Sequence, residues 1–122
     1  MSVTTVKNDE LLFKDGQDTI LRIKEDISDN VFSVQVYGDI STAFLADFED
    51  EMLTILTLRK DIRLDLSNVE NACGGLLNVL LFIQKEMDRV HQGTMRLVAP
   101  SRPVQRLLDE NGFYDLLDIA VR

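Results

Sequence analysis

The sequence alternates between two spacings of apolar residues, and this alternation limits the folds open to the chain more than any other feature. Ile62, Leu64 and Leu66 recur at a spacing of two, whereas the apolar residues that follow Gly75 recur at spacings of three and four. The first spacing is typical of a strand and the second of a helix. A strand, a helix and another strand in this order predict parallel strands joined by right-handed crossovers, which is an α/β fold.

The same patterns predict the other elements. Strands are expected at residues 19–24, 31–37, 62–67 and 95–99, with a short helical turn and an optional last strand within 113–121. Residues 38–41 are expected to break the second strand, and residues 68–71 to form a polar loop after the third. The first two strands suit an antiparallel hairpin. Together the elements predict a small mixed sheet of four to five strands, with helices packed mainly on one side.

Three helices are predicted between these strands. The first starts at Ser41 or Thr42 and runs to about residue 58, the second runs from Gly75 to about residue 91, and the third is capped by Ser101 and stopped at residues 111–112. The first helix has one apolar stripe and the second has a wider one. The first stripe is Phe44, Phe48, Met52 and Ile55; the second is Leu76, Leu80, Ile83, Met87 and Val90, widened by Leu77, Leu81 and Phe82.

Length and composition indicate one domain without a membrane segment. The chain has 122 residues, enough for one domain; we expect an N-terminal extension at 1–17, a strand or loop on the domain edge, and a folded domain at 18–122. The net charge of −8 disfavours nucleic acid and anionic lipid as partners. The lone Cys73 excludes an internal disulfide and indicates a reducing compartment, so the chain is expected to be soluble and cytoplasmic.

No catalytic or metal-binding group can be assembled from these residues. Cys73 and His91 lie 18 positions apart near opposite ends of one predicted helix, which separates them by roughly 27 Å. A base must lie within hydrogen-bond reach of its nucleophile. Histidine and cysteine do not recur at ligand spacing, so neither an enzyme nor a cofactor is expected.

The pair Gly74 and Gly75 is open to two interpretations. Glycines at a helix start allow another backbone to come close, which makes them a steric requirement of the turn. Amide groups at a helix start also suit an anion or the carboxylate of a partner.

Several segments resemble one family, in the same order along the chain. Residues 64–69 (Leu-Asp-Leu-Ser-Asn-Val) followed by 73–77 (Cys-Gly-Gly-Leu-Leu) are similar to the central motif of STAS domains, which include bacterial anti-sigma factor antagonists. Residues 38–41 are similar to the Gly-Glu-Leu-Asp of that family, and residues 111–113 with 116–117 to its closing segment. The resemblance covers residues 19–121 and implies a non-enzymatic signalling domain that regulates transcription by binding proteins.

The chain departs from this family at the phosphorylated position. In the family a serine at the start of the second helix is phosphorylated by a partner kinase, and that serine falls on Gly75 or, with one residue deleted, on Gly74. Neither residue has a hydroxyl. The aspartate that precedes the serine is replaced by Cys73 or Ala72. The resemblance therefore implies the docking surface without its phospho-switch.

The resemblance implies a kinase-type anti-sigma factor, or another regulatory ATPase, as the partner. The expected partner-binding residues are Ser41, Thr42, Ser67, Asn71, Cys73, Gly74, Gly75 and Leu76. Three alternatives stay open: an accessory subunit of a transporter ATPase, a scaffold in a sensory complex, and a sensor that binds a nucleotide or anion at the glycine pair. A homodimer also stays open.

Overall fold

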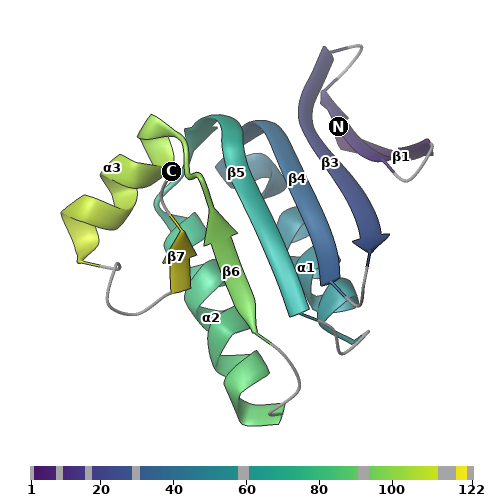
Figure 1. Cartoon of the computed structure of the whole chain (residues 1–122). Coiled ribbons are helices and arrows are strands. Elements are labelled where there is room, and N and C mark those ends of the chain that lie inside the picture. The colour runs from purple at the N-terminus through teal and green to yellow at the C-terminus, as the bar shows by residue number, and fades with distance from the viewer. Residues whose placement is uncertain are drawn as a thin grey trace.

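A computed structural model of the chain describes residues 2–7, 10–15, 18–28, 31–57, 61–90, 94–112 and 118–120. Its strands form one sheet in which spatial order follows chain order (Figure 1). The strands are β1 (Ser2–Lys7), β2 (Glu10–Asp15), β3 (Asp18–Ser28), β4 (Val31–Ile40), β5 (Asp61–Ala72), β6 (Met95–Val98) and β7 (Asp118–Ala120). The helices are the 3₁₀ turn η1 (Thr42–Phe44), α1 (Leu45–Leu56), α2 (Gly75–Val90) and α3 (Arg102–Asn111).

The sheet has an antiparallel half and a parallel half. Strands β1 to β4 pair antiparallel, and β4 to β7 pair parallel. Each parallel step moves in the same direction across the sheet, so right-handed crossovers place α1, α2 and α3 on the same face. In Figure 1, α1 and α2 lie behind the strands. The predicted class, a mixed sheet with helices mainly on one side, is confirmed.

The sheet has seven strands, which is more than the predicted four to five. The two additional strands are β1 and β2, which come from the predicted N-terminal extension. β2 pairs with β3, and the Phe13 ring is buried with its centroid 6.0 Å from that of Phe44. The division of the chain after residue 17 stays a prediction. None of the described helices is long and apolar enough to cross a membrane.

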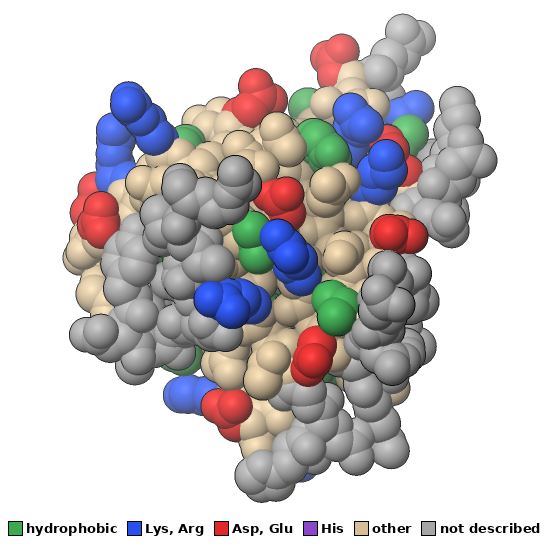
Figure 2. Space-filling view, viewed as in Figure 1, with side chains coloured by type: hydrophobic (Ala, Val, Ile, Leu, Met, Phe, Trp, Pro, Cys, Tyr) green, Lys and Arg blue, Asp and Glu red, His purple; other side chains and the backbone are tan. Residues whose placement is uncertain are grey.

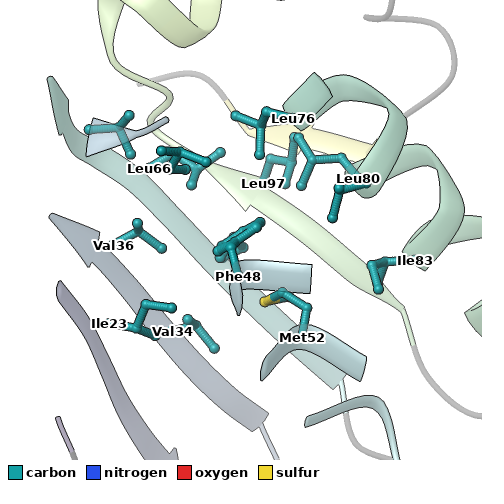
Figure 3. Close-up of a cluster of buried hydrophobic side chains, with 14 of the residues drawn as sticks. Ile23, Val34, Val36, Phe48, Met52, Leu66, Leu76, Leu80, Ile83 and Leu97 are labelled. Carbon is teal, nitrogen blue, oxygen red and sulfur yellow. The ribbon is translucent and has the colours of Figure 1, made fainter. Parts of the chain in front are cut away.

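The predicted apolar stripes form the core between the sheet and the helices. Val34, Leu66 and Leu97 contribute fully buried side chains from three adjacent strands (Figure 3). All four residues of the first helical stripe are buried, as are the first four of the second; the side chain of Val90 lies outside the described set. The prediction for Phe82 is wrong. Its side chain is 43% exposed and lines a surface groove together with residues of α1.

Two predicted interruptions are continuous strand, and both predictions are wrong. Residues 38–40 continue β4 and residues 68–72 continue β5, because the two segments pair with each other. Gly38 pairs with Val69, and the register shifts between Gln35 and Tyr37 and again between Gly38 and Asp39. Gly38 has a φ of +98°, and a Cβ there would collide with the Ile20 carbonyl. Backbone pairing between β4 and β5 thus keeps these residues extended, although their polar side chains indicate a loop.

The helix boundaries differ from the predictions by a few residues. The first helix opens with η1 and ends at Leu56, where the amide of Thr57 donates to the carbonyls of Leu53 and Thr54. The described residues do not include residues 58–60, among them Arg59 and Lys60, or residue 91. Ser41 and Ser101 occupy cap positions without a side-chain cap bond. The third helix ends as predicted, at Gly112 in the left-handed region.

Strand β6 ends one residue earlier than predicted because Ala99 has a φ of +47°. An alanine side chain crowds the following carbonyl in this conformation. The kink turns the chain toward α3, and the amide of Ser101 then donates to the Leu66 carbonyl at 3.1 Å. The strained residue therefore lies directly after the end of β6, beside Leu66 of β5.

This strain predicts that Ala99→Gly stabilises the protein. We expect the free energy of unfolding to rise by about 1 kcal/mol, because glycine adopts this φ without crowding. Ala46→Gly, the same substitution in α1, is the matched control and should lower the free energy of unfolding by about 1 kcal/mol. Thermal melts followed by circular dichroism compare the two. A lower melting temperature for Ala99→Gly would contradict the assignment of strain.

Candidate functional site

The carboxyl ends of β4 and β5 meet the starts of α1 and α2 at one corner of the molecule. The amide of Cys73 donates to the Ile40 carbonyl at 2.9 Å, which extends the pairing of β4 and β5 up to the first turn of α2. Beside it, the Asn71 side-chain amide donates to Asp39 Oδ1 at 3.0 Å. Ligands of open parallel sheets bind outside the carboxyl ends of the strands. This corner is therefore the first place to look for a binding site.

Some backbone amides in the first turn of α2 already donate hydrogen bonds within that turn. The amide of Leu76 donates to the Cys73 carbonyl at 3.1 Å, and that of Leu77 donates to the Gly74 carbonyl at 3.2 Å. Two of the amides expected to be free at this helix start are thus engaged within the turn. The first turn also contains no acidic residue. An approaching group meets a compact backbone corner with little side-chain cover.

The two glycines have different roles. An ideal Cβ on Gly75 would lie 2.5 Å from Leu45 Cδ2, so the missing side chain lets α1 pack closely against α2. A Cβ on Gly74 would meet no atom within 4 Å, and Gly74 is exposed. A side chain at Gly75 would therefore require the end of the Leu45 side chain to shift, whereas Gly74 leaves an uncovered space at the start of the helix.

A groove runs along α1 and α2 from this corner; we call it the α1–α2 groove. It has a volume of about 500 Å³ and is lined by Thr42, Leu45, Ala46, Glu49, Gly75, Asn78, Val79 and Phe82. Its floor is mostly apolar, and Phe82 is the one large hydrophobic side chain that is exposed among the described residues. Exposed aromatic side chains of this kind are typical anchors of protein interfaces.

The structure brings together some of the predicted partner-binding residues and separates others. Thr42 and Gly75 line the α1–α2 groove, with Gly74 beside it. Ser41 and Cys73 are half-buried, and Asn71 is exposed on the neighbouring strand end. The Leu76 side chain is fully buried, so it supports the corner from the core.

Ser67 lies on the other face of the sheet. Its hydroxyl donates to Asp65 Oδ1 at 2.6 Å, and its amide donates to the same oxygen at 2.9 Å. It lines a depression of about 640 Å³ together with Tyr37 and Asn68. The predicted rim therefore consists of two surfaces that the sheet separates.

The sequence analysis missed the groove residues that follow Thr42 and Gly75. The missed residues are Leu45, Ala46, Glu49, Asn78, Val79 and Phe82. These groove residues form a second series on each helix, at spacings of three, four and seven from the first residue. The series is 42, 45, 46 and 49 on η1 and α1, and 75, 78, 79 and 82 on α2. This spacing marks one helical face and could have been found by the same count that identified the core stripes.

Charges lie around the corner without forming a metal-binding cluster in the described ranges. At the far end of α2, Arg89 and Glu86 form an ion pair at 2.8 Å, and this hydrogen bond lowers the pKa of the Glu86 carboxyl. Both side chains are on the surface, so the pair contributes little to stability. Glu49 is the one charged residue that lines the groove.

The fold is similar to those of solved anti-sigma factor antagonists. An anti-sigma factor antagonist from Mycobacterium paratuberculosis has a TM-score of 0.74 and 18% identity, over 81% of this chain and 84% of that one. The antagonist SpoIIAA in its unphosphorylated form has a TM-score of 0.65 and 10% identity, over 82% of this chain and 89% of that one. The phosphorylated form of the Bacillus SpoIIAA has a TM-score of 0.60 and 10% identity, over 82% and 92%. No protein-family model and no curated protein sequence matches the chain.

The packing of Gly75 predicts that the two glycines differ in their tolerance of a side chain. Gly75→Ala should lower the free energy of unfolding by no more than about 1 kcal/mol, because its Cβ displaces only the end of the partly buried Leu45 side chain. Gly74→Ala is the matched control and should change it by less than about 0.5 kcal/mol. Denaturant titrations measure the free energy of unfolding of both variants. In a Leu45→Ala background, Gly75→Ala should leave this free energy almost unchanged. If Gly75→Ala lowered the free energy of unfolding equally in the parent and in the Leu45→Ala background, the contact between residue 75 and Leu45 would be contradicted.

Proposed function

We propose that this chain is a non-enzymatic, cytoplasmic protein-interaction domain of the anti-sigma factor antagonist type. Its partner is a kinase-type anti-sigma factor or a related regulatory ATPase, which binds at Gly74 and along the α1–α2 groove. The observation that carries the proposal is the exposed Phe82 in an apolar groove that leads to an uncovered helix start. The fold similarity to antagonists and the resemblance of residues 64–77 to the STAS motif support it.

The chemistry of the groove limits what the partner presents there. Leu45 and Phe82 offer apolar surface, and Glu49 offers a negative charge beside it. The chain as a whole has a net charge of −8. A partner segment with an apolar side chain flanked by lysine or arginine would complement both features, and the overall charge would increase its rate of association.

The proposed interaction works without a phosphorylated serine at the helix start. A phosphoserine adds about −1.5 to −2 charges and three acceptor oxygens, and here neither Gly74 nor Gly75 can carry it. The chain would stay competent to bind, and the state of the partner or the amount of the protein would control the interaction.

Gly74 is the position at which this proposal is tested. Gly74→Asp adds one negative charge where a side chain has room, and acids are tolerated at a helix N-terminus, so the fold should stay intact. We expect it to weaken partner binding by more than about tenfold, or 1.4 kcal/mol. Gly74→Asn, with nearly the same shape, should weaken binding less. Lys24→Asp, on the opposite face of the sheet, should change it little.

The partner for this test comes from affinity purification of the parent protein from its native cell, followed by mass spectrometry. Titration calorimetry then compares the variants, with melting temperatures measured alongside. If a folded Gly74→Asp protein and a folded Phe82→Ala protein both bind as tightly as the parent, the groove is not the docking surface. Purification of a transporter ATPase or a sensory complex, with no kinase-type anti-sigma factor, would replace the antagonist-type role with that of an accessory subunit or scaffold.

A second variant tests the absence of catalytic chemistry. Cys73→Ala should preserve partner binding and signalling in cells, because the thiol is half-buried packing at the corner. The free energy of unfolding should fall by no more than about 1 kcal/mol, since little volume is removed. Complete loss of signalling by a variant that stays folded and still binds would show that the thiol has a chemical role.

A further inference from the structure

The face of the sheet opposite the helices carries a depression where β3, β4 and β5 lie side by side. No described helix lies in front of these strands in Figure 1, because α1 and α2 lie behind them. The depression is the one that Ser67 lines, with a volume of about 640 Å³, and Arg22 of β3, Tyr37 of β4, and Asn68 and Glu70 of β5 also line it. Its volume is within the range of small-molecule sites, which is about 300–1,000 Å³. We call it the open-face depression.

Two β-bulges in β5 determine which side chains line one wall of this depression. The pairing of β5 with β4 shifts register twice, and β5 contains one residue more than β4 at each shift. The first shift gives β5 the adjacent polar pair Ser67 and Asn68, and the second follows Val69 and includes Glu70. Val69 is buried, whereas the three polar residues are exposed. Bulges are common next to active sites, where they re-aim a side chain. Here they gather three polar side chains of one strand along one wall.

The wall that β5 forms presents hydrogen-bond acceptors. The Ser67 hydroxyl donates its hydrogen to Asp65 Oδ1 at 2.6 Å, so the Ser67 oxygen can only accept further bonds. The Asn68 side-chain amide donates to that oxygen at 3.4 Å, and Asn68 Oδ1 accepts no hydrogen bond from a described residue. Glu70 forms no hydrogen bond or ion pair within the part of the chain that the structure describes. A carboxylate and two neutral oxygens suit an ammonium group, which has three donors and no acceptor.

The wall that β3 forms presents a guanidinium group that is oriented from two sides. Arg22 Nε donates to Glu10 Oε1 at 2.8 Å, and the guanidinium carbon lies 4.8 Å from the centre of the Tyr37 ring. The two terminal nitrogens of Arg22 donate to no described residue. Because Glu10 compensates the charge of Arg22, this wall offers oriented donors and no free positive charge. Two parallel N–H groups of a guanidinium match the two oxygens of a carboxylate.

The two walls are close enough for one small ligand to contact both. Arg22 is the register partner of Tyr37, and Tyr37 is the register partner of Asn68. Neighbouring strands lie about 4.8 Å apart, so the Cα atoms of Arg22 and Asn68 are separated by about 10 Å. Figure 2, which views this face, shows basic and acidic side chains mixed across it. The surface therefore suits a ligand that carries both charges better than it suits a polyanion.

We propose that the open-face depression binds a small zwitterion of the amino-acid type. The ammonium group would donate to Glu70, Asn68 Oδ1 and Ser67 Oγ, and the carboxylate would accept from the terminal nitrogens of Arg22. Since Glu10 already balances Arg22, the acids around the depression leave it with excess negative charge, and a ligand that is only an anion gains no net attraction. This site is separate from the α1–α2 groove, and the inference does not depend on the function proposed for that groove.

The test titrates the isotope-labelled protein with the standard L-amino acids and follows its amide signals by NMR. At least one amino acid should bind and shift the signals of residues 67–70. Its carboxyl amide lacks the carboxylate and its N-acetyl derivative lacks the ammonium group, so each should bind at least about tenfold more weakly. Absence of binding by every amino acid would overturn the proposal. Equal affinity for the amide would mean a simple cation site, equal affinity for the N-acetyl derivative a simple anion site, and either result would also overturn it.

Paired variants locate the binding. Glu70→Gln should weaken it at least about tenfold, and Arg22→Lys, which keeps a positive charge beside Glu10 but loses the fork of donors, at least about threefold. Glu110→Gln and Arg106→Lys are the same substitutions at exposed positions of α3 and should change the affinity less than about twofold. Melting temperatures show whether each variant is folded. Glu70 has no described partner to lose, so Glu70→Gln should fold, and an unchanged affinity in that variant would contradict the site.

Phe82→Ala separates this site from the α1–α2 groove. Because the groove lies on the other side of the sheet, the variant should bind the amino acid as tightly as the parent does, whatever its effect on a protein partner. Loss of amino-acid binding in a folded Phe82→Ala protein would place the ligand in the groove and overturn the proposal. Inorganic phosphate is titrated in parallel, and tighter binding of phosphate than of any amino acid would replace the zwitterion by an anion.

Discussion

The parallel pairing of β4 with β5 is the constraint on which the rest of the structure depends. It joins the antiparallel half of the sheet to the parallel half and extends from Val31 beside Asp61 to Ile40 beside Ala72. Because both strands alternate in phase, their fully buried residues, Val34 and Leu64 among them, lie on one face. A shift of one residue in this register would turn those side chains toward water and remove the surface on which the helices pack.

The same pairing also places the candidate site. It continues one bond beyond the strands, from the Cys73 amide to the Ile40 carbonyl. This bond holds the first turn of α2 beside the end of β4, from which η1 and α1 begin. The two helices therefore start at one corner, and their second series of residues face each other across the α1–α2 groove.

The sequence predicts elements well where one face of an element is buried. The strand at Ile62, Leu64 and Leu66 is confirmed, because hydrophobic burial leaves a period in the sequence. The helical stripes are confirmed apart from Phe82, which is exposed, and Val90, whose side chain is outside the described set. Prediction from the sequence fails where backbone pairing alone keeps the chain extended, as at residues 38–40 and 68–72. The role of Gly75 could not be read locally, since the atom that excludes its side chain belongs to Leu45, on another helix.

The two glycines also separate two reasons for the missing serine. If the family position is residue 75, the absent hydroxyl follows from packing, because no side chain fits there unless Leu45 moves. If it is residue 74, a serine would fit, and its absence has no steric cause. In both cases neither Gly74 nor Gly75 carries a hydroxyl that a kinase could modify.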